Sequence, residues 1–150
     1  MTAAAQRAAV IAEARTWLNT PYRHQGRVKG AGVDCGMLLL EVFSTTGVIE
    51  AGAVEDYPRD WHLHRGEERY LGQVLQHAQE IAGPGQAGDI AVWRFGRSFA
   101  HGALVVDWPT IIHSYMGLGV VYGDALADQD LAERPCRFFT CWGLHNNTKS

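Results

Sequence analysis

The hydrophobic period of the chain changes at the Gly-Pro-Gly sequence of residues 83–85, and this change constrains the fold more than any other feature. Before it, apolar residues recur at helical spacing. The helices predicted there span residues 3–18, 35–46 and 67–82. After it, short apolar runs bounded by turn residues have the character of strands. The strands predicted there span residues 89–95, 101–107, 110–115, 120–122 and 137–142, with one or two helical turns within 124–131. Helices followed by consecutive strands favour an α+β fold, with N-terminal helices packed on an antiparallel sheet.

A single domain accounts for residues 1–150, because this is an ordinary domain length and the sequence contains no repeat or low-complexity tract. Hydrophobic residues make up 47% and charged residues 19% of the chain, which is typical of a folded globular domain. The net charge of −3, with both signs mixed along the chain, lacks the basic surface of a nucleic-acid-binding protein. No apolar run is as long as a membrane span. We therefore predict a domain that binds neither nucleic acid nor membrane.

The N-terminal segment does not have the pattern of a secretion signal. Residues 1–10 are rich in alanine but contain Arg7, and the charged Glu13 and Arg15 follow soon after. This leaves no uninterrupted apolar stretch of the kind that a signal peptide needs. We expect the chain to be made in a cytoplasm, so that work outside the cell membrane would require another delivery route.

Cys35 stands at the start of a predicted helix, directly after a glycine-rich loop. Asp34 suits the N-cap position, because its carboxylate can accept hydrogen bonds from the first free backbone N–H groups. The partial positive charge of the helix N-terminus then favours the thiolate form of Cys35. A small buried cysteine without a chemical role is the common alternative. The other cysteines, Cys136 and Cys141, make the total odd, so no disulfide framework is expected and we predict structural roles for both.

Two histidines of the predicted sheet are candidate partners for Cys35. A thiol nucleophile needs a group that takes its proton and later protonates the leaving group, and imidazole does both near neutral pH. His101 begins one predicted strand and His113 lies inside the next. An odd-length turn near residues 108–109 would place both side chains on one face, where His113 accepts a hydrogen bond from His101 and orients it. Taken singly, His113 is better explained as a hydrogen-bonded histidine of a half-buried strand, and His101 is equally well explained as an exposed residue at a strand start, so the prediction depends on all three residues together.

Motifs of other chemistries are absent from the sequence. It contains no His-Glu-x-x-His, no Cys-x-x-Cys, no phosphate-binding loop and no dinucleotide fingerprint. His62 and His64 lie in the long aperiodic connection of residues 48–66 without a third ligand nearby, and we predict a solvated loop there. We therefore predict neither a metal nor a cofactor.

Five short motifs, spread over nearly the whole chain, carry a resemblance to a known family. They are TPYRHQG at residues 20–26, VDCG at 33–36, GDIAVW at 88–93, AHGALVV at 100–106 and IHS at 112–114. In this order and at this spacing, the chain resembles the NlpC family of bacterial cell-wall cysteine peptidases. Gly36 directly follows Cys35, and His24 stands where many members have tryptophan. This single-domain form is similar to the tail-associated peptidases of bacteriophages and of phage-like gene transfer agents.

The resemblance implies a circularly permuted papain-like fold, with the cysteine at a helix N-terminus and the histidines on the sheet. It implies that Cys35 is the nucleophile, His101 the general base and acid, and His113 the orienting third member. Tyr22 matches a tyrosine that lines the active site of the family, although spacing alone explains it equally well as a half-buried ring. Asp34 matches an acidic position that in some members meets the free amino end of the stem peptide. The backbone N–H of Cys35 would stabilise the oxyanion.

From this resemblance we expect a peptidoglycan endopeptidase that cuts stem peptides, usually between D-glutamate and a diamino acid. Assembly into a phage-like particle would deliver it to the periplasm or cell wall of a target cell, with tail hub or baseplate proteins as partners. Two alternatives remain open. One is another Cys–His acyl chemistry, either an amidase that cuts between sugar and peptide or an acyltransferase. The other is a catalytically silent structural module of a tail tip.

Overall fold

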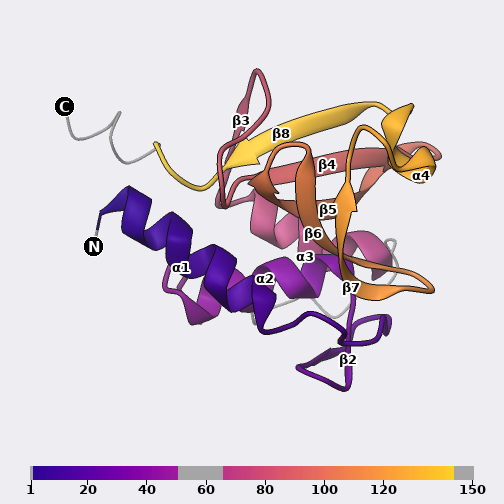
Figure 1. Cartoon of the computed structure of the whole chain (residues 1–150), viewed down its shortest axis with the longest axis horizontal. Coiled ribbons are helices and arrows are strands. Elements are labelled where there is room, and N and C mark those ends of the chain that lie inside the picture. Colours follow the sequence, from indigo (N-terminus) through magenta and orange to yellow (C-terminus); the bar gives the residue numbers. More distant parts are fainter. Residues whose placement is uncertain (1, 51–65, 144–150) are drawn as a thin grey trace.

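Three helices lie along one face of a six-stranded antiparallel sheet in the computed structural model, which describes residues 2–50 and 66–143 (Figure 1). The helices are α1 (Ala3–Arg15), α2 (Cys35–Thr45) and α3 (Gly66–Leu75), and a short α4 (Gln129–Ala132) follows late in the chain. The sheet has the order β3 (Gln79–Ile81), β8 (Cys136–Thr140), β4 (Ile90–Phe95), β5 (Ser98–Asp107), β6 (Thr110–Tyr115) and β7 (Gly119–Asp124). A separate antiparallel pair is formed by β1 (Arg27–Val28) and β2 (Gly32–Val33). This arrangement confirms the predicted α+β class.

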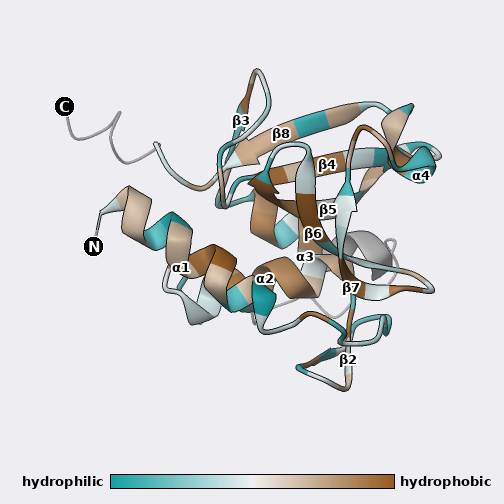
Figure 2. Ribbon diagram, viewed as in Figure 1, coloured by the Kyte–Doolittle hydropathy of each residue, from teal (hydrophilic) through white to brown (hydrophobic). Residues whose placement is uncertain are grey.

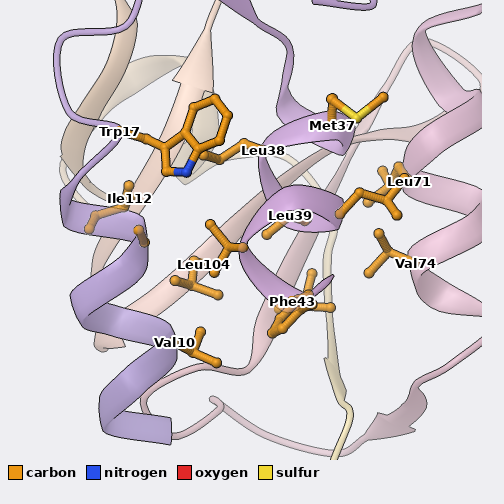
Figure 3. Packing of buried hydrophobic residues seen from close by; sticks show 14 of the residues in the cluster. Val10, Trp17, Met37, Leu38, Leu39, Phe43, Leu71, Val74, Leu104 and Ile112 are labelled. Carbon is orange, nitrogen blue, oxygen red and sulfur yellow. The ribbon is translucent and has the colours of Figure 1, made fainter. Parts of the chain in front are cut away.

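Helix α2 is the central helix because it is apolar on almost every side. Eight of its eleven residues are buried, and a helix of this kind is stable only when other elements surround it. It packs against α1, α3, β5 and β6. Figure 3 shows Leu39 and Phe43 of α2 between Val10 of α1 and Val74 of α3. This packing fixes the N-terminal end of α2, and with it Cys35, against the sheet.

The two faces of the sheet carry separate hydrophobic clusters, as expected from the two-residue period of a strand. The cluster under the helices includes Ile90, Val92, Leu104, Ile112 and Val120. The cluster on the other face consists of Ala91, Trp93, Ala103, Val105, Ile111, Ala125 and Leu131. Figure 2 shows hydrophobic residues concentrated where α2 meets β5 and β6. Because Leu131 belongs to the second cluster, α4 is anchored on the face of the sheet opposite to α2.

Helix α1 ends at Arg15, three residues earlier than predicted. The residues after it form turns, and Asn19 adopts a positive φ of 73°. The backbone N–H of Asn19 donates to the carbonyl of Val120, at 2.9 Å. A hydrogen bond to β7 thus redirects the chain where the apolar pattern alone would continue the helix.

Helix α3 ends at Leu75, whereas the prediction carried it to residue 82. Residues predicted as its last turns form β3, in which Glu80 pairs with Phe139 of β8. The apolar pattern of this stretch fits both a helix and a strand, and the unpaired edge of β8 decides between them. The prediction of a helix was wrong here for that tertiary reason.

The remaining boundaries differ from prediction by a few residues. β5 begins at Ser98, β7 is longer than expected, and β1 and β2 were not predicted. β8 ends at Thr140, so Cys141 lies beyond the strand, and all three cysteines are free. Among the helices of residues 2–50 and 66–143, none combines the length and hydrophobicity needed to cross a membrane.

Candidate active site

Cys35 is the first residue of α2 and Asp34 is its N-cap, as the sequence predicted. One carboxylate oxygen of Asp34 accepts the backbone N–H of Met37 at 2.8 Å. The other oxygen accepts the N–H of Gln25 at 2.7 Å, from the loop that precedes the helix. Asp34 therefore fixes both the start of α2 and the approach of the chain to it.

The residues just before Asp34 are held against both β6 and the Tyr22 segment. The carbonyl of Val33 accepts the hydroxyl of Ser114 at 2.7 Å, and Val33 forms a parallel bridge with Tyr22. The N–H of Val33 donates to the carbonyl of Pro21. These bonds attach the start of α2 to the strand that carries His113.

The thiol of Cys35 lies against the backbone of β5 on both sides of His101. Its sulfur is 3.7 Å from the carbonyl oxygen of Ala100, and the backbone N–H of Gly102 also faces it. Gly102 leaves room for the helices on this strand, because a Cβ there would lie 2.7 Å from Leu71 Cδ1 and 3.2 Å from Leu39 Cδ1, so that both leucine side chains would have to shift. The helix that carries the nucleophile thus packs directly onto the strand that carries His101.

His101 and His113 are joined by a short hydrogen bond, with 2.8 Å between Nε2 of His101 and Nδ1 of His113. Both are buried, His101 being 8% and His113 1% exposed. The structure therefore brings together the two histidines that the sequence singled out. Among the described residues, the hydrogen bond of the Cys35 thiol goes to Ala100 rather than to an imidazole.

The shared face of the two histidines depends on a β-bulge. The turn between β5 and β6 contains two residues, Trp108 and Pro109, rather than the odd number that was expected. A regular hairpin with this turn would place the histidines on opposite faces. The register shifts at Val106, and this extra residue returns both histidines to one face.

Aromatic rings enclose His101 on several sides. Trp93, Phe95 and Tyr115 have ring centroids 6.0, 5.7 and 5.2 Å from that of His101. Tyr115 also stacks on His113, with 5.3 Å between centroids and 30° between planes. Tyr115 was not among the site residues predicted from the sequence. Its position two residues after His113 on one strand was a usable signal, because such residues share a face.

Burial dominates the electrostatics of the three residues. It raises the pKa of the Cys35 thiol to about 12 and lowers the pKa of His101 to about 3 and that of His113 to about 4. At neutral pH the resting forms are therefore a thiol and two neutral imidazoles. The helix N-terminus was expected to favour the thiolate, but the loss of solvation at this buried position outweighs it.

Tyr22 and Asp34, the predicted substrate contacts, have different environments. Tyr22 is half-buried and lines a cavity of about 370 Å³ between the end of the α1 segment and the turn after β6. The other residues lining it are Asn19, Pro21, Gly117, Leu118 and Gly119. Asp34 is only 3% exposed, and burial raises the pKa of its carboxyl although backbone N–H groups bind it. Its contact with substrate stays a prediction.

Potential metal ligands do not gather in the described part of the chain, where no group of three or more His, Cys, Asp or Glu side chains could hold an ion. His62 and His64, predicted to lie in a solvated loop, fall outside the described residues. The described site thus offers a thiol, a paired imidazole and backbone N–H groups, which are the components of acyl transfer through a thioester.

Comparison by sequence finds no matching protein-family profile and no matching curated protein. Comparison by structure does find matches. The NlpC/p60 domain of the peptidoglycan hydrolase SagA superposes with a TM-score of 0.57 and 20% identity, over 87% of this chain and 96% of that one. A Staphylococcus aureus protein described as similar to a lipoprotein of the NLP/P60 family superposes with a TM-score of 0.60 and 21% sequence identity. The match covers 89% of this chain and 41% of the S. aureus chain. An NlpC/p60 family protein of Bacillus cereus superposes with a TM-score of 0.60 and 18% sequence identity, over 87% of this chain and 39% of the B. cereus chain. The chain therefore has the fold of an NlpC/p60 domain.

Proposed function

We propose that residues 1–150 form a cysteine peptidase domain that hydrolyses the stem peptides of peptidoglycan. The observation that carries this proposal is the placement of Cys35 at a helix N-terminus, with its sulfur 3.7 Å from the carbonyl oxygen of Ala100, the residue directly before His101, which is itself hydrogen-bonded to His113. The shared fold gives further support, because SagA, one of the matching proteins, is described as a peptidoglycan hydrolase.

In the proposed reaction, His101 takes the proton of the Cys35 thiol as the sulfur bonds to the carbonyl carbon of the substrate. His101 passes this proton to the leaving nitrogen, and the C–N bond breaks to give an amine and a thioester. His101 then takes a proton from water, which attacks the thioester, and the sulfur leaves and recovers the proton. His113 orients the His101 ring throughout. The N–H of Cys35, in the first turn of α2, has no helical acceptor and is proposed to stabilise the oxyanion.

Tyr22 and Asp34 are the proposed substrate contacts. Tyr22 lines a cavity and is joined by its backbone to Val33, two residues before Cys35, which supports a place for its ring beside the nucleophile. Asp34 would meet the free amino end of the stem peptide through an oxygen that also binds the N–H of Gln25.

The motif resemblance also supports finer proposals. The bond cut would join D-glutamate to a diamino acid. The domain would be made in a bacterial cytoplasm and incorporated into a phage-like tail, next to hub or baseplate proteins. It would then open the cell wall locally, in the periplasm or wall of the target cell.

Digestion of purified peptidoglycan, with the fragments weighed by mass spectrometry, tests the function directly. Wild-type protein should release fragments split within the stem peptide, and Cys35→Ala should release none.

His101→Ala should lower the rate by about 100-fold or more, because it removes the general base. His113→Ala should lower it less, by roughly tenfold, since the base remains but loses its orienting partner. Cys136→Ala, at a half-buried cysteine of β8, should keep wild-type activity.

The same fragment masses separate the peptidase from an amidase of identical Cys–His chemistry. An amidase would release whole stem peptides and leave sugar chains without peptides. An acyltransferase would join peptides to an added amine instead of hydrolysing them. Either product pattern would contradict the peptidase assignment while keeping Cys35 as the nucleophile.

The burial of Cys35, which is 6% exposed, is the observation that favours a catalytically silent structural module. A silent module would leave peptidoglycan unchanged, and wild type and Cys35→Ala would then be indistinguishable. Testing walls that contain diaminopimelate and walls that contain lysine guards against a mere mismatch of substrate. Unchanged fragments from both kinds of wall would reject the proposed enzyme.

A further inference from the structure

His113 has a second ring nitrogen that the hydrogen bond to His101 does not use. Because Nδ1 faces His101, Nε2 faces away from it, toward β7. A Cβ at Gly123 of β7 would lie only 3.0 Å from this Nε2. No hydrogen bond to Nε2 is formed by the described residues. Something other than a direct partner must therefore decide whether Nε2 carries the hydrogen of the neutral ring.

The tautomer of His113 decides whether His101 can accept a proton from Cys35. A neutral imidazole has one N–H and one lone pair. With its hydrogen on Nδ1, His113 donates to Nε2 of His101, and the neutral His101 ring then already has a hydrogen on Nδ1. With its hydrogen on Nε2, His113 accepts from the N–H of His101, and Nδ1 of His101 keeps a free lone pair. Only the second arrangement suits a general base for the thiol.

The chain after β7 carries Asp128 back over the face of the sheet on which His113 lies, because Leu131 of the α4 that follows is buried in one cluster with Ile111, two residues before His113 on β6. Asp128 is the N-cap residue of α4, yet its side chain makes no capping hydrogen bond, and it is half-buried. Its backbone N–H donates to the carbonyl of Asp124 at 2.8 Å, which fixes it just beyond the end of β7. Burial lowers the pKa of His113, and the Asp128 carboxylate opposes this effect. A negative charge beside the ring favours a proton on the nitrogen that faces it.

The rest of this segment is held in place by several contacts. Leu131 is buried in the cluster on this face of the sheet. The Arg134 guanidinium lies 3.7 Å from the centroid of the Phe95 ring, which contacts His101. Arg134 also donates to the carbonyl of Asp130 at 2.7 Å and to that of Arg94 at 3.3 Å. The position of α4 beside the histidine pair is therefore well defined by packing and hydrogen bonds.

Several ionisable groups face the histidine pair. Besides each other, the histidines face Tyr115 of β6, which stacks on His113 and packs edge-to-face against His101. The α4 segment contributes Asp128, Asp130 and Arg134. The Asp130 carboxylate faces the Tyr115 hydroxyl. Arg134 disfavours a positive charge on His101, whereas Asp128 favours one on His113. Asp128 is thus the negative group of this segment that acts on His113 itself.

We propose that Asp128 is a positioning residue whose carboxylate holds the hydrogen of His113 on Nε2, so that His101 presents a free Nδ1 lone pair to the Cys35 thiol. The effect is electrostatic, because no hydrogen bond or ion pair between Asp128 and His113 is formed in the described structure. The inference rests on the proposed function for its catalytic consequence, but the tautomer of His113 is a property of the folded protein alone.

Two-bond ¹H–¹⁵N correlation spectra of the histidine rings test the tautomer directly. In wild-type protein at pH 7, both His101 and His113 should carry their hydrogen on Nε2. Asp128→Asn keeps the size of the side chain but removes its charge, and should shift His113 toward the Nδ1–H form. Asp128→Glu should restore the wild-type spectrum. Glu133→Gln removes a negative charge from an exposed position beside the same helix and should leave the spectrum unchanged.

Kinetics on peptidoglycan fragments test the catalytic consequence. Asp128→Asn should lower kcat by up to about tenfold, no more than the loss of His113 itself, because fewer molecules then hold His101 in the form that accepts the thiol proton, with little change in KM. The acid limb of the pH–rate profile should move to lower pH, because removing the carboxylate lowers the pKa of the pair. Asp128→Glu should recover most of the activity, and Glu133→Gln should match wild type.

The two measurements separate failure of this inference from failure of the proposed function. A His113 ring in the Nε2–H form in both wild type and Asp128→Asn would overturn the inference, whatever the activity. So would a wild-type ring already in the Nδ1–H form. If wild-type protein cuts no peptidoglycan but the tautomer shifts as described, the proposed function fails and the assignment of Asp128 stands.

Discussion

Cys35 is subject to two opposing effects, the field of the α2 N-terminus and its own burial. The helix end stabilises a thiolate, typically by less than about 2 kcal/mol. Burial acts the other way and raises the pKa of the thiol to about 12. A protein that used Cys35 as a nucleophile would therefore transfer its proton to His101 as the new bond forms, rather than store a thiolate beforehand. The neutral state of His101 at rest suits this role of proton acceptor.

Alkylation by iodoacetamide measures the state of this thiol. Because the thiolate is the reactive form, the rate at Cys35 should rise about tenfold for each pH unit between pH 7 and 9. Mass spectrometry of the peptide that contains Cys35 follows the reaction, and Cys35→Ser shows the background from Cys136 and Cys141. A rate that is already constant near neutral pH would mean a stored thiolate and would contradict the dominance of burial.

At the scale of elements, Asp34 joins α2 to the loop that precedes it. Its two oxygens bind Met37 within the helix and Gln25 in the loop. Most N-cap residues bind only their own helix, as Thr2 does at α1 through the N–H of Ala5. The position of Cys35 relative to the loop therefore depends on this buried carboxylate as well as on the backbone bonds of Val33.

Replacing Asp34 should accordingly cost more stability than replacing an ordinary cap. Asp34→Ala should lower the free energy of unfolding by about 2–3 kcal/mol, because it removes a cap and leaves the Gln25 N–H without its acceptor. Asp34→Asn keeps one oxygen and should cost less. Thr2→Ala, at an exposed cap, should cost about 1 kcal/mol. Urea denaturation measures all three, and equal losses for Asp34→Ala and Thr2→Ala would refute the double role.

At the scale of the whole molecule, the candidate site ties the two halves of the fold together. Cys35 belongs to the helical half, and His101 and His113 belong to the sheet. Folding also buries the two imidazoles, which the unfolded chain would expose to water. In the folded protein the histidine pKa values fall to about 3 and about 4, from an ordinary value of 6.5. Folding is therefore coupled to the release of protons from this pair.

Stability should fall in mild acid for this reason. Below pH 6.5 the unfolded chain binds protons at both histidines, whereas the folded protein does not until its lower pKa values are reached. The free energy of unfolding should thus decrease as the pH falls from 7 to 5, by up to about 2 kcal/mol for each histidine. Urea denaturation across this range checks the slope. His113→Gln should flatten it, and equal slopes in wild type and His113→Gln would contradict the coupling.

The sequence by itself determined the types of most elements and the residues worth examining. The apolar residues after Asp34 predict a buried helix with Cys35 at its start, and the structure has that helix. The strand that carries His113 was predicted with its observed bounds. These features are local, because caps, periods and turn residues act within a few positions of the chain. The end of α3 at Leu75 was missed because it depends on pairing between β3 and β8, more than fifty residues apart.

Only the tertiary structure decided how the histidines meet and how strongly they are buried. The sequence predicted one face for His101 and His113 through an odd-length turn, but the turn has two residues and the odd residue is the bulge at Val106. A bulge forms where the packing of both faces of a sheet favours one register over another, so strand pattern alone does not locate it. The pKa of Cys35 likewise depends on the tertiary structure. The helix N-terminus can be read from the sequence, but burial is a property of the assembled fold, and burial has the larger effect.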